Sequence, residues 1–189
     1  SPASSQSLTD RFKSLFGGKS EEAPAGEARP LGDEAPSDLS CPPVSIRAGA
    51  STYQVAAPGK QPVGNDLRFQ ATITRTAREC RYNSGEITAR IGIQGRVIAG
   101  PAGAPATVEV PLRVAVVQSS VQEEKTIATK AYRTSVSMSE GGSVPFTLVI
   151  EDLQYPAPPG AVSDTYVFYI GFDPQALKPE PKPRATKKK

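Results

Sequence analysis

The stretch VEVPLRVAVV, residues 108–117, carries an apolar side chain at every second position from Val108 to Val116. Successive side chains of a β-strand point to opposite faces of the sheet, so this alternation gives the strand one apolar face and one polar face. The stretch therefore predicts a half-buried strand of an antiparallel sheet.

The same two-residue period recurs through the middle of the chain. No comparable helical period occurs between Cys41 and Asp173, and Thr126–Val136 predicts a weaker, threonine-rich strand. Turn-forming residues separate the runs at Asn83-Ser-Gly, Gly100-Pro-Ala-Gly, Glu140-Gly-Gly-Ser and Tyr155–Gly160. The other alternating positions are Val44 and Ile46; Leu67, Phe69, Ala71 and Ile73; Ile87, Ala89, Ile91 and Ile93; Val144, Phe146, Leu148 and Ile150; and Tyr166, Phe168, Ile170 and Phe172.

These runs predict an all-β domain over residues 41–175 with about seven or eight antiparallel strands. We expect a two-sheet sandwich, and the regular hairpin spacing leaves an up-and-down β-barrel as the alternative. Pro111 and Pro145 have no N–H to donate, so their strands are expected to be edges or to carry bulges there.

The domain resembles immunoglobulin-like and fibronectin-type sandwiches at the level of architecture. The resemblance covers residues 41–175 and implies two packed antiparallel sheets. The chain has no tryptophan, whereas immunoglobulin domains have one in the core. In addition, Cys41 precedes the first predicted strand instead of lying within an early one.

Composition excludes several kinds of active site. The chain has 189 residues, no histidine and two cysteines. It cannot form a Ser-His-Asp or Cys-His active site, a histidine-containing zinc site or a four-cysteine zinc site. The net charge of +3 is too small to indicate nucleic-acid binding. We therefore expect a protein that is not an enzyme, needs no cofactor or metal and does not bind nucleic acid.

Residues 1–18 predict a short amphipathic helix. Its apolar side chains lie three or four residues apart and so share one face, while Gly17 and Gly18 can end it. Arg11 and Lys13 lie beside that face, which suits docking to a membrane surface or a partner; packing on the protein's own sandwich, or fraying, is the alternative. The apolar positions are Leu8, Phe12, Leu15 and Phe16.

Both ends of the chain have compositions typical of disordered segments. Residues 19–40, rich in Glu, Ala, Pro, Gly and Ser, predict a flexible linker. Residues 176–189 alternate proline with charge and predict a disordered basic tail. Its final residues Lys187, Lys188 and Lys189 can be attracted to anionic lipid or a polyanionic polymer, or can serve only solubility.

The order of these segments resembles a bacterial envelope lipoprotein after maturation. In that class a lipidated cysteine precedes Ser-, Pro- and Ala-rich residues, a flexible tether and a globular domain. Here Ser1-Pro-Ala-Ser-Ser and residues 19–40 match the segments that follow the cysteine. The resemblance implies a periplasmic or outer-membrane-associated location.

Cys41 and Cys80 allow two interpretations. They can form a disulfide between the start of the domain and the end of its first long strand, or they can be free thiols in a reducing compartment. Both lie within the predicted ordered body and near strand ends. We favour the disulfide, which indicates an oxidising compartment such as the periplasm.

Four arginines on two neighbouring predicted strands are candidates for an anion-binding or partner-binding face. Guanidinium groups bind carboxylate and phosphate in a bidentate manner. The alternative is a solvated sheet face whose arginines pair with carboxylates such as Glu79 and Glu86. The four are Arg68, Arg75, Arg90 and Arg96.

Taken together, these features predict a non-enzymatic protein-binding or assembly module, tethered in the envelope, whose partner is another envelope protein. The alternative is a binder of anionic glycan or lipid that uses the four arginines and the lysine tail. Exposed edge strands are further candidate contacts, since an edge can accept a strand from a partner.

Overall fold

A computed structural model describes residues 41–139 and 141–178. The predicted helix of residues 1–18, the linker of residues 19–40 and the tail beyond residue 178, with Lys187, Lys188 and Lys189, lie outside the described residues. So do the proposed docking positions Leu8, Phe12, Leu15 and Phe16.

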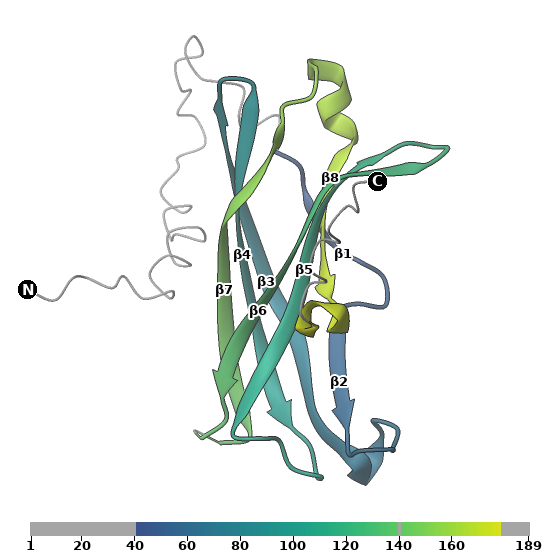
Figure 1. The fold of residues 1–189 in the computed structure, drawn as a ribbon, viewed down its shortest axis with the longest axis vertical. Helices are drawn as coiled ribbons and strands as arrows, with labels where there is room; N and C mark the ends of the chain where they lie inside the picture. The colour runs from purple at the N-terminus through teal and green to yellow at the C-terminus, as the bar shows by residue number, and fades with distance from the viewer. Residues whose placement is uncertain (1–40, 140, 179–189) are drawn as a thin grey trace, which may run out of the picture.

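The described chain forms eight strands in two four-stranded sheets (Figure 1). The first sheet has the order β1-β8-β5-β6 and the second the order β2-β3-β4-β7. Each sheet has two open edges, so the fold is sandwich-like and the barrel alternative is wrong. The strands are β1 (Val44–Ile46), β2 (Thr52–Ala56), β3 (Leu67–Asn83), β4 (Glu86–Ala99), β5 (Thr107–Ser119), β6 (Glu124–Ser137), β7 (Ser143–Pro156) and β8 (Tyr166–Phe172).

The predicted alternation places the core between the sheets. From Val108 to Val116 every second residue of β5 is buried, and Ile87, Ala89, Ile91 and Ile93 of β4 face them from the second sheet. Partners in an antiparallel pair share a face, so the register assigns the inner face of every neighbouring strand. All buried side chains among the described residues are apolar or tyrosine.

Two details of the strand arrangement differ from the sequence expectations. β2 adds a strand whose alternation, Tyr53 and Val55, is too short to stand out. β1 pairs in parallel with β8, although only antiparallel pairs were predicted. The reason is that β1 and β8 come from opposite ends of the domain, so no hairpin fixes their relative direction.

The two prolines behave differently. β7 is an edge strand, as Pro145 predicts. β5 is a central strand, contrary to the expectation from Pro111, and its register shift lies between Val116 and Val117. Pairing with β8 stops at Leu112, and the Pro111 carbonyl accepts the N–H of Asp173 beyond that point. The side of Pro111 that lacks an N–H donor therefore faces a position where no strand pairs with β5.

Gly95 is one of the glycines that close packing requires. Gly95 of β4 lies on the inner face opposite Phe146 of β7 and Ile73 of β3. A Cβ atom at Gly95 would overlap the Phe146 ring and the carbonyl oxygen of Thr72. The absence of a side chain at Gly95 thus lets the Phe146 ring fill the core there.

Candidate functional site

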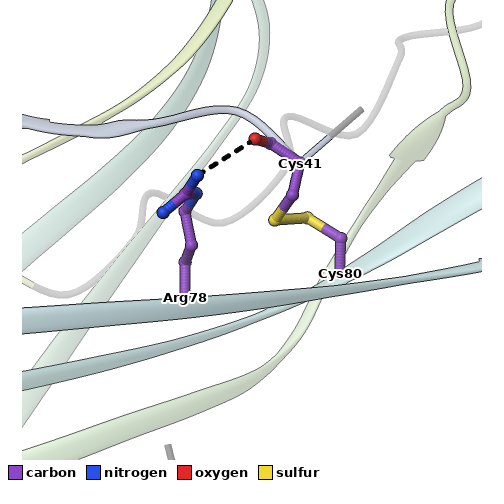
Figure 2. The surroundings of a disulfide bond; sticks show 3 residues. All are labelled: Cys41, Arg78 and Cys80. Atoms are coloured by element: carbon purple, nitrogen blue, oxygen red, sulfur yellow. Dashed lines mark hydrogen bonds between the residues drawn. A yellow bond between two sulfur atoms is a disulfide. The ribbon is translucent and has the colours of Figure 1, made fainter. Parts of the chain in front are cut away.

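A disulfide joins Cys41 to Cys80 of β3 (Figure 2). The Cα atoms lie 5.5 Å apart, within the usual range. An Arg78 N–H donates to the Cys41 carbonyl oxygen at 3.5 Å, and Phe168 N–H donates to the Pro43 carbonyl oxygen at 2.9 Å. The segment that leads into β1 is therefore fixed to both sheets. Disulfide bonds persist in oxidising compartments.

One side of the sandwich is bordered by the two long edge strands, β6 and β7, which contact each other there (Figure 1). Each has 14 residues, whereas the edges on the other side, β1 and β2, have three and five. Long edges expose rows of backbone donors and acceptors that can pair with another chain. This side is therefore the principal candidate for strand pairing with a partner.

β7 carries features that oppose such pairing. The bond from Ala99 N–H to the Gly142 carbonyl oxygen indicates that Val144 and Phe146 direct their backbone groups toward β4. Pro145 then faces outward, where it removes a donor from the edge. Further along, Glu151 and Asp152 together oppose Arg90, and this bulge interrupts the ladder. β7 is thus protected at two places against pairing with a strand of another chain.

β6 is protected against such pairing only over its first half. Its register shift lies beside Ala128, and the charged side chain of Lys130 turns inward to contact β7. Beyond that point the ladder with β5 is regular. The bond from Met138 N–H to the Ala106 carbonyl oxygen indicates which residues face β5. The alternate residues direct their N–H and C=O groups outward, and they are Ala131, Arg133, Ser135 and Ser137.

A groove of about 330 Å³ lies between these two edges, next to the outward-facing half of β6. Inward-facing Val136 of β6 and Val144 and Phe146 of β7 contribute its apolar part. Phe146 is 5% exposed, so its ring belongs to the core and only its margin lines the groove. The lining residues are Thr134, Ser135, Val136, Ser137, Val144, Pro145, Phe146 and Thr147.

Beyond the groove, a polar cluster joins the two edges. The Lys130 ammonium and the Tyr132 hydroxyl, both from β6, donate to Asp152 of β7, the tyrosine at 2.9 Å. The hydrogen bond from Lys130 holds the pKa of Asp152 below its ordinary value. Burial, with the hydrogen bond to Asp152, raises the pKa of Tyr132. The cluster therefore ties the edges together at neutral pH.

All four predicted arginines lie on the outer face of the second sheet. Arg90 lies 3.7 Å from Glu79 and 3.4 Å from Glu151, so two carboxylates offset its charge. Arg68 donates to the Gly103 carbonyl oxygen at 2.9 Å.

The same strand register places Arg75 and Arg96 on this outer face. Arg75 is opposite Gln94, and Arg96 donates to the Ser143 hydroxyl at 2.8 Å. The predicted face therefore exists as a geometric unit, and its cationic character is weaker than four arginines suggest. Glu86, the other carboxylate named as a pairing candidate, forms the last pair of the ladder with Asn83.

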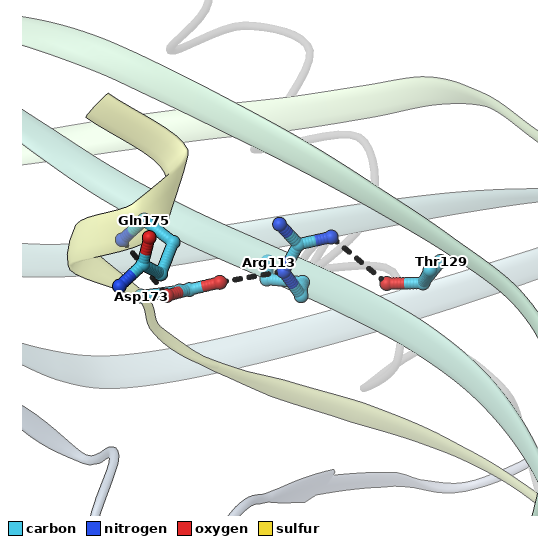
Figure 3. Close-up of polar contacts among 4 residues, drawn as sticks. All are labelled: Arg113, Thr129, Asp173 and Gln175. Carbon is cyan, nitrogen blue, oxygen red and sulfur yellow. Dashed lines mark hydrogen bonds and ion pairs between the residues drawn. The ribbon is translucent and has the colours of Figure 1, made fainter. Parts of the chain in front are cut away.

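A smaller hollow of about 160 Å³ lies on the outer face of the first sheet, and the sequence pattern did not identify it. Arg113 of β5 donates to Asp173 at 2.6 Å and to Thr129 at 3.1 Å (Figure 3). Burial raises the pKa of Asp173, but the hydrogen bonds from Arg113 and from the Gln175 N–H outweigh this, so the pKa lies below its ordinary value.

Arg47 forms another border of the hollow. Its guanidinium lies 4.5 Å from the centre of the Tyr169 ring and 3.9 Å from Glu124. Each of the two arginines already has a carboxylate beside it, so the hollow has little net charge. Arg113 is the one charged residue in residues 110–117, and this was the signal in the sequence that could have marked it as a residue in need of a partner.

Within residues 41–139 and 141–178, no three His, Cys, Asp or Glu side chains come close enough together to hold a metal ion. No helix in that part of the chain has the length and apolar character needed to cross a membrane.

Comparisons of the chain with family models, with curated proteins and with solved structures found no match.

Proposed function

We propose that this protein is a non-enzymatic binding module of a bacterial cell envelope, with an immunoglobulin-like sandwich that binds another envelope protein. The observation that carries the proposal is the asymmetry between the two long edges. β7 is interrupted by Pro145 and a bulge, whereas Ala131–Ser137 of β6 presents an uninterrupted row of backbone groups beside a groove. A fold that only avoided aggregation would be expected to guard both edges.

The disulfide supports the location, because such bonds form in the periplasm and are rare in the cytosol. The lipoprotein-like order of segments supports attachment through residues before Cys41. Residues 1–18 are proposed as a second contact with the membrane surface or with the partner.

Photo-cross-linking in intact bacteria that produce the protein tests the function. A photoreactive side chain is placed at Ser135 on the β6 edge, with matched positions at Gln70 on the outer face of the second sheet and Ser45 on β1. We expect a discrete protein adduct from Ser135 and none from Ser45. If no position yields a protein adduct while osmotic shock releases the protein free, the binding-module proposal is wrong.

A second candidate function is binding of anionic glycan or lipid, favoured by the shared face of Arg68, Arg75 and Arg96. Binding to dextran sulfate or to phosphatidylglycerol vesicles would then weaken steeply as salt shortens the screening length from roughly 10 Å at 0.1 M. Replacing Arg75 and Arg96 with glutamine would have the same effect. Binding that is insensitive to both changes excludes this function.

A further inference from the structure

We propose that Ala131–Ser137 of β6 accepts an extended segment of another polypeptide as an added strand, and that this segment carries an acidic side chain facing Arg133. The proposal rests on the protein-binding function above and specifies its surface and the chemistry of its partner. Four observations support it: backbone direction, the groove, charge and the contrast with β7.

The backbone supplies the affinity of strand addition. Ala131, Arg133, Ser135 and Ser137 direct donors and acceptors away from β5, and none of the four is a proline. Their side chains lie on the outer face of the sheet and, apart from Arg133, are small. An incoming strand therefore meets little steric resistance over these seven residues.

The groove determines which side chains fit. Residues of an added strand that lie opposite Thr134 and Val136 would point inward, over the groove of about 330 Å³ lined by Val144 and Phe146. Residues opposite Arg133 and Ser135 would point to the solvent side. The partner segment should therefore alternate medium-sized apolar residues with polar ones.

Charge distinguishes between possible partners. Residues 125–137 contain two lysines and one arginine and no acidic residue. Asp152 pairs with Lys130, and the one carboxylate diagonal to Arg133, that of Glu109, accepts a hydrogen bond from Ser135. A second copy of the chain, paired through Ala131–Ser137, would bring two Arg133 side chains onto one ribbon with no acidic residue in residues 125–137 of either copy. A segment with Asp or Glu opposite Arg133 gains a favourable cross-strand pair instead.

The test uses the full chain and a capped nine-residue peptide that alternates valine with threonine and has one central aspartate in place of threonine. Two N-methylated versions of the peptide block opposite sets of alternate amides. Because one edge uses only alternate N–H groups, one version should bind roughly tenfold more weakly than the other. Equal binding of the two versions contradicts strand addition.

A charge swap tests the acidic preference. Arg133→Glu should weaken binding of the aspartate peptide roughly tenfold, and should strengthen binding of the same peptide with lysine at the centre by a similar factor. Loss of binding to both peptides would indicate a damaged edge, so it would overturn the charge assignment. Thermal unfolding of the variant confirms that it folds.

Hydrogen exchange locates the peptide. We expect slower exchange of Ala131, Arg133, Ser135 and Ser137 on addition of peptide, and no change along β7. Protection of these amides without peptide would mean that another part of the chain or a second copy occupies the edge, and would overturn the proposal. Protection of the outer face of the second sheet instead would leave the protein-binding function intact while rejecting this surface.

Discussion

Removing the disulfide should be the most damaging single chemical change to the described fold. The bond spans a separation of 39 residues, and in the chain-entropy model closing a loop of that size contributes about 4 kcal/mol. The bond also fixes the segment that reaches β1, whose three residues pair with β8 only. The variant Cys41→Ser/Cys80→Ser should therefore lose stability globally and lose β1 pairing locally.

Urea unfolding measures the global part. With a slope near 2 kcal/mol/M, the midpoint should fall by roughly 2 M relative to the oxidised protein. Reducing agent should bring the unmodified protein to the same midpoint and leave the variant unchanged. Hydrogen exchange measures the local part, since Arg47 N–H, which donates to Ile170 at 2.9 Å, should exchange faster in the variant. A midpoint within 0.5 M of the oxidised protein, roughly 1 kcal/mol at that slope, would refute the reasoning.

Three further changes have defined outcomes. Gly95→Ala should destabilise the domain by roughly 1–3 kcal/mol in urea unfolding, because the new Cβ displaces the Phe146 ring; an unchanged midpoint contradicts this packing. Stability should fall as pH drops below about 4, where Asp152, whose pKa is lower folded than unfolded, takes up a proton. Asp152→Asn should flatten that fall, and an identical pH profile would mean that its contact with Lys130 contributes nothing. Pro145→Thr restores an outward donor on β7 and should raise self-association in sedimentation velocity, with no change expected if the edge is covered.

The sequence predicted the strands and the inward positions in the first part of β3, but not the change of face that follows them. Alternation is visible where one face is fully buried, as from Val108 to Val116. In β3 the inward positions Phe69, Ala71 and Ile73 are followed by a register shift between Ile73 and Arg75. The extra residue reverses the parity, because a bulge adds one residue to one strand.

That bulge also determines the arginine face. Arg68 and Arg75 are separated by an odd number of positions, so a regular strand would place them on opposite faces. The bulge brings both to the outer face, beside Arg90 and Arg96 of β4. The predicted cluster therefore exists because of a local feature that alternation alone does not reveal.

The β6 edge was only partly predictable for a related reason. Thr126–Val136 was identified as a weak strand because its inward positions include Lys130, Tyr132 and Thr134. These polar residues face inward because the strand borders the open side of the sandwich, where Asp152 and solvent satisfy them. A weak alternation can thus indicate an edge strand. The sequence does not show the strand order, however, so it does not show which side of that strand stays unpaired.

The position of the groove relative to the disulfide bears on how a tethered module would work. Through the ladders, Cys80 aligns with Ala89 and then with Leu153 of β7, whereas the groove lies beside Val144–Thr147. At about 3.3 Å per residue the two levels are roughly 20–30 Å apart along the sandwich. If residues before Cys41 attach the protein to a membrane, load enters through the disulfide into β3, a central strand of 17 residues. The open half of β6 is then at the far end, directed away from the attachment and accessible to a partner.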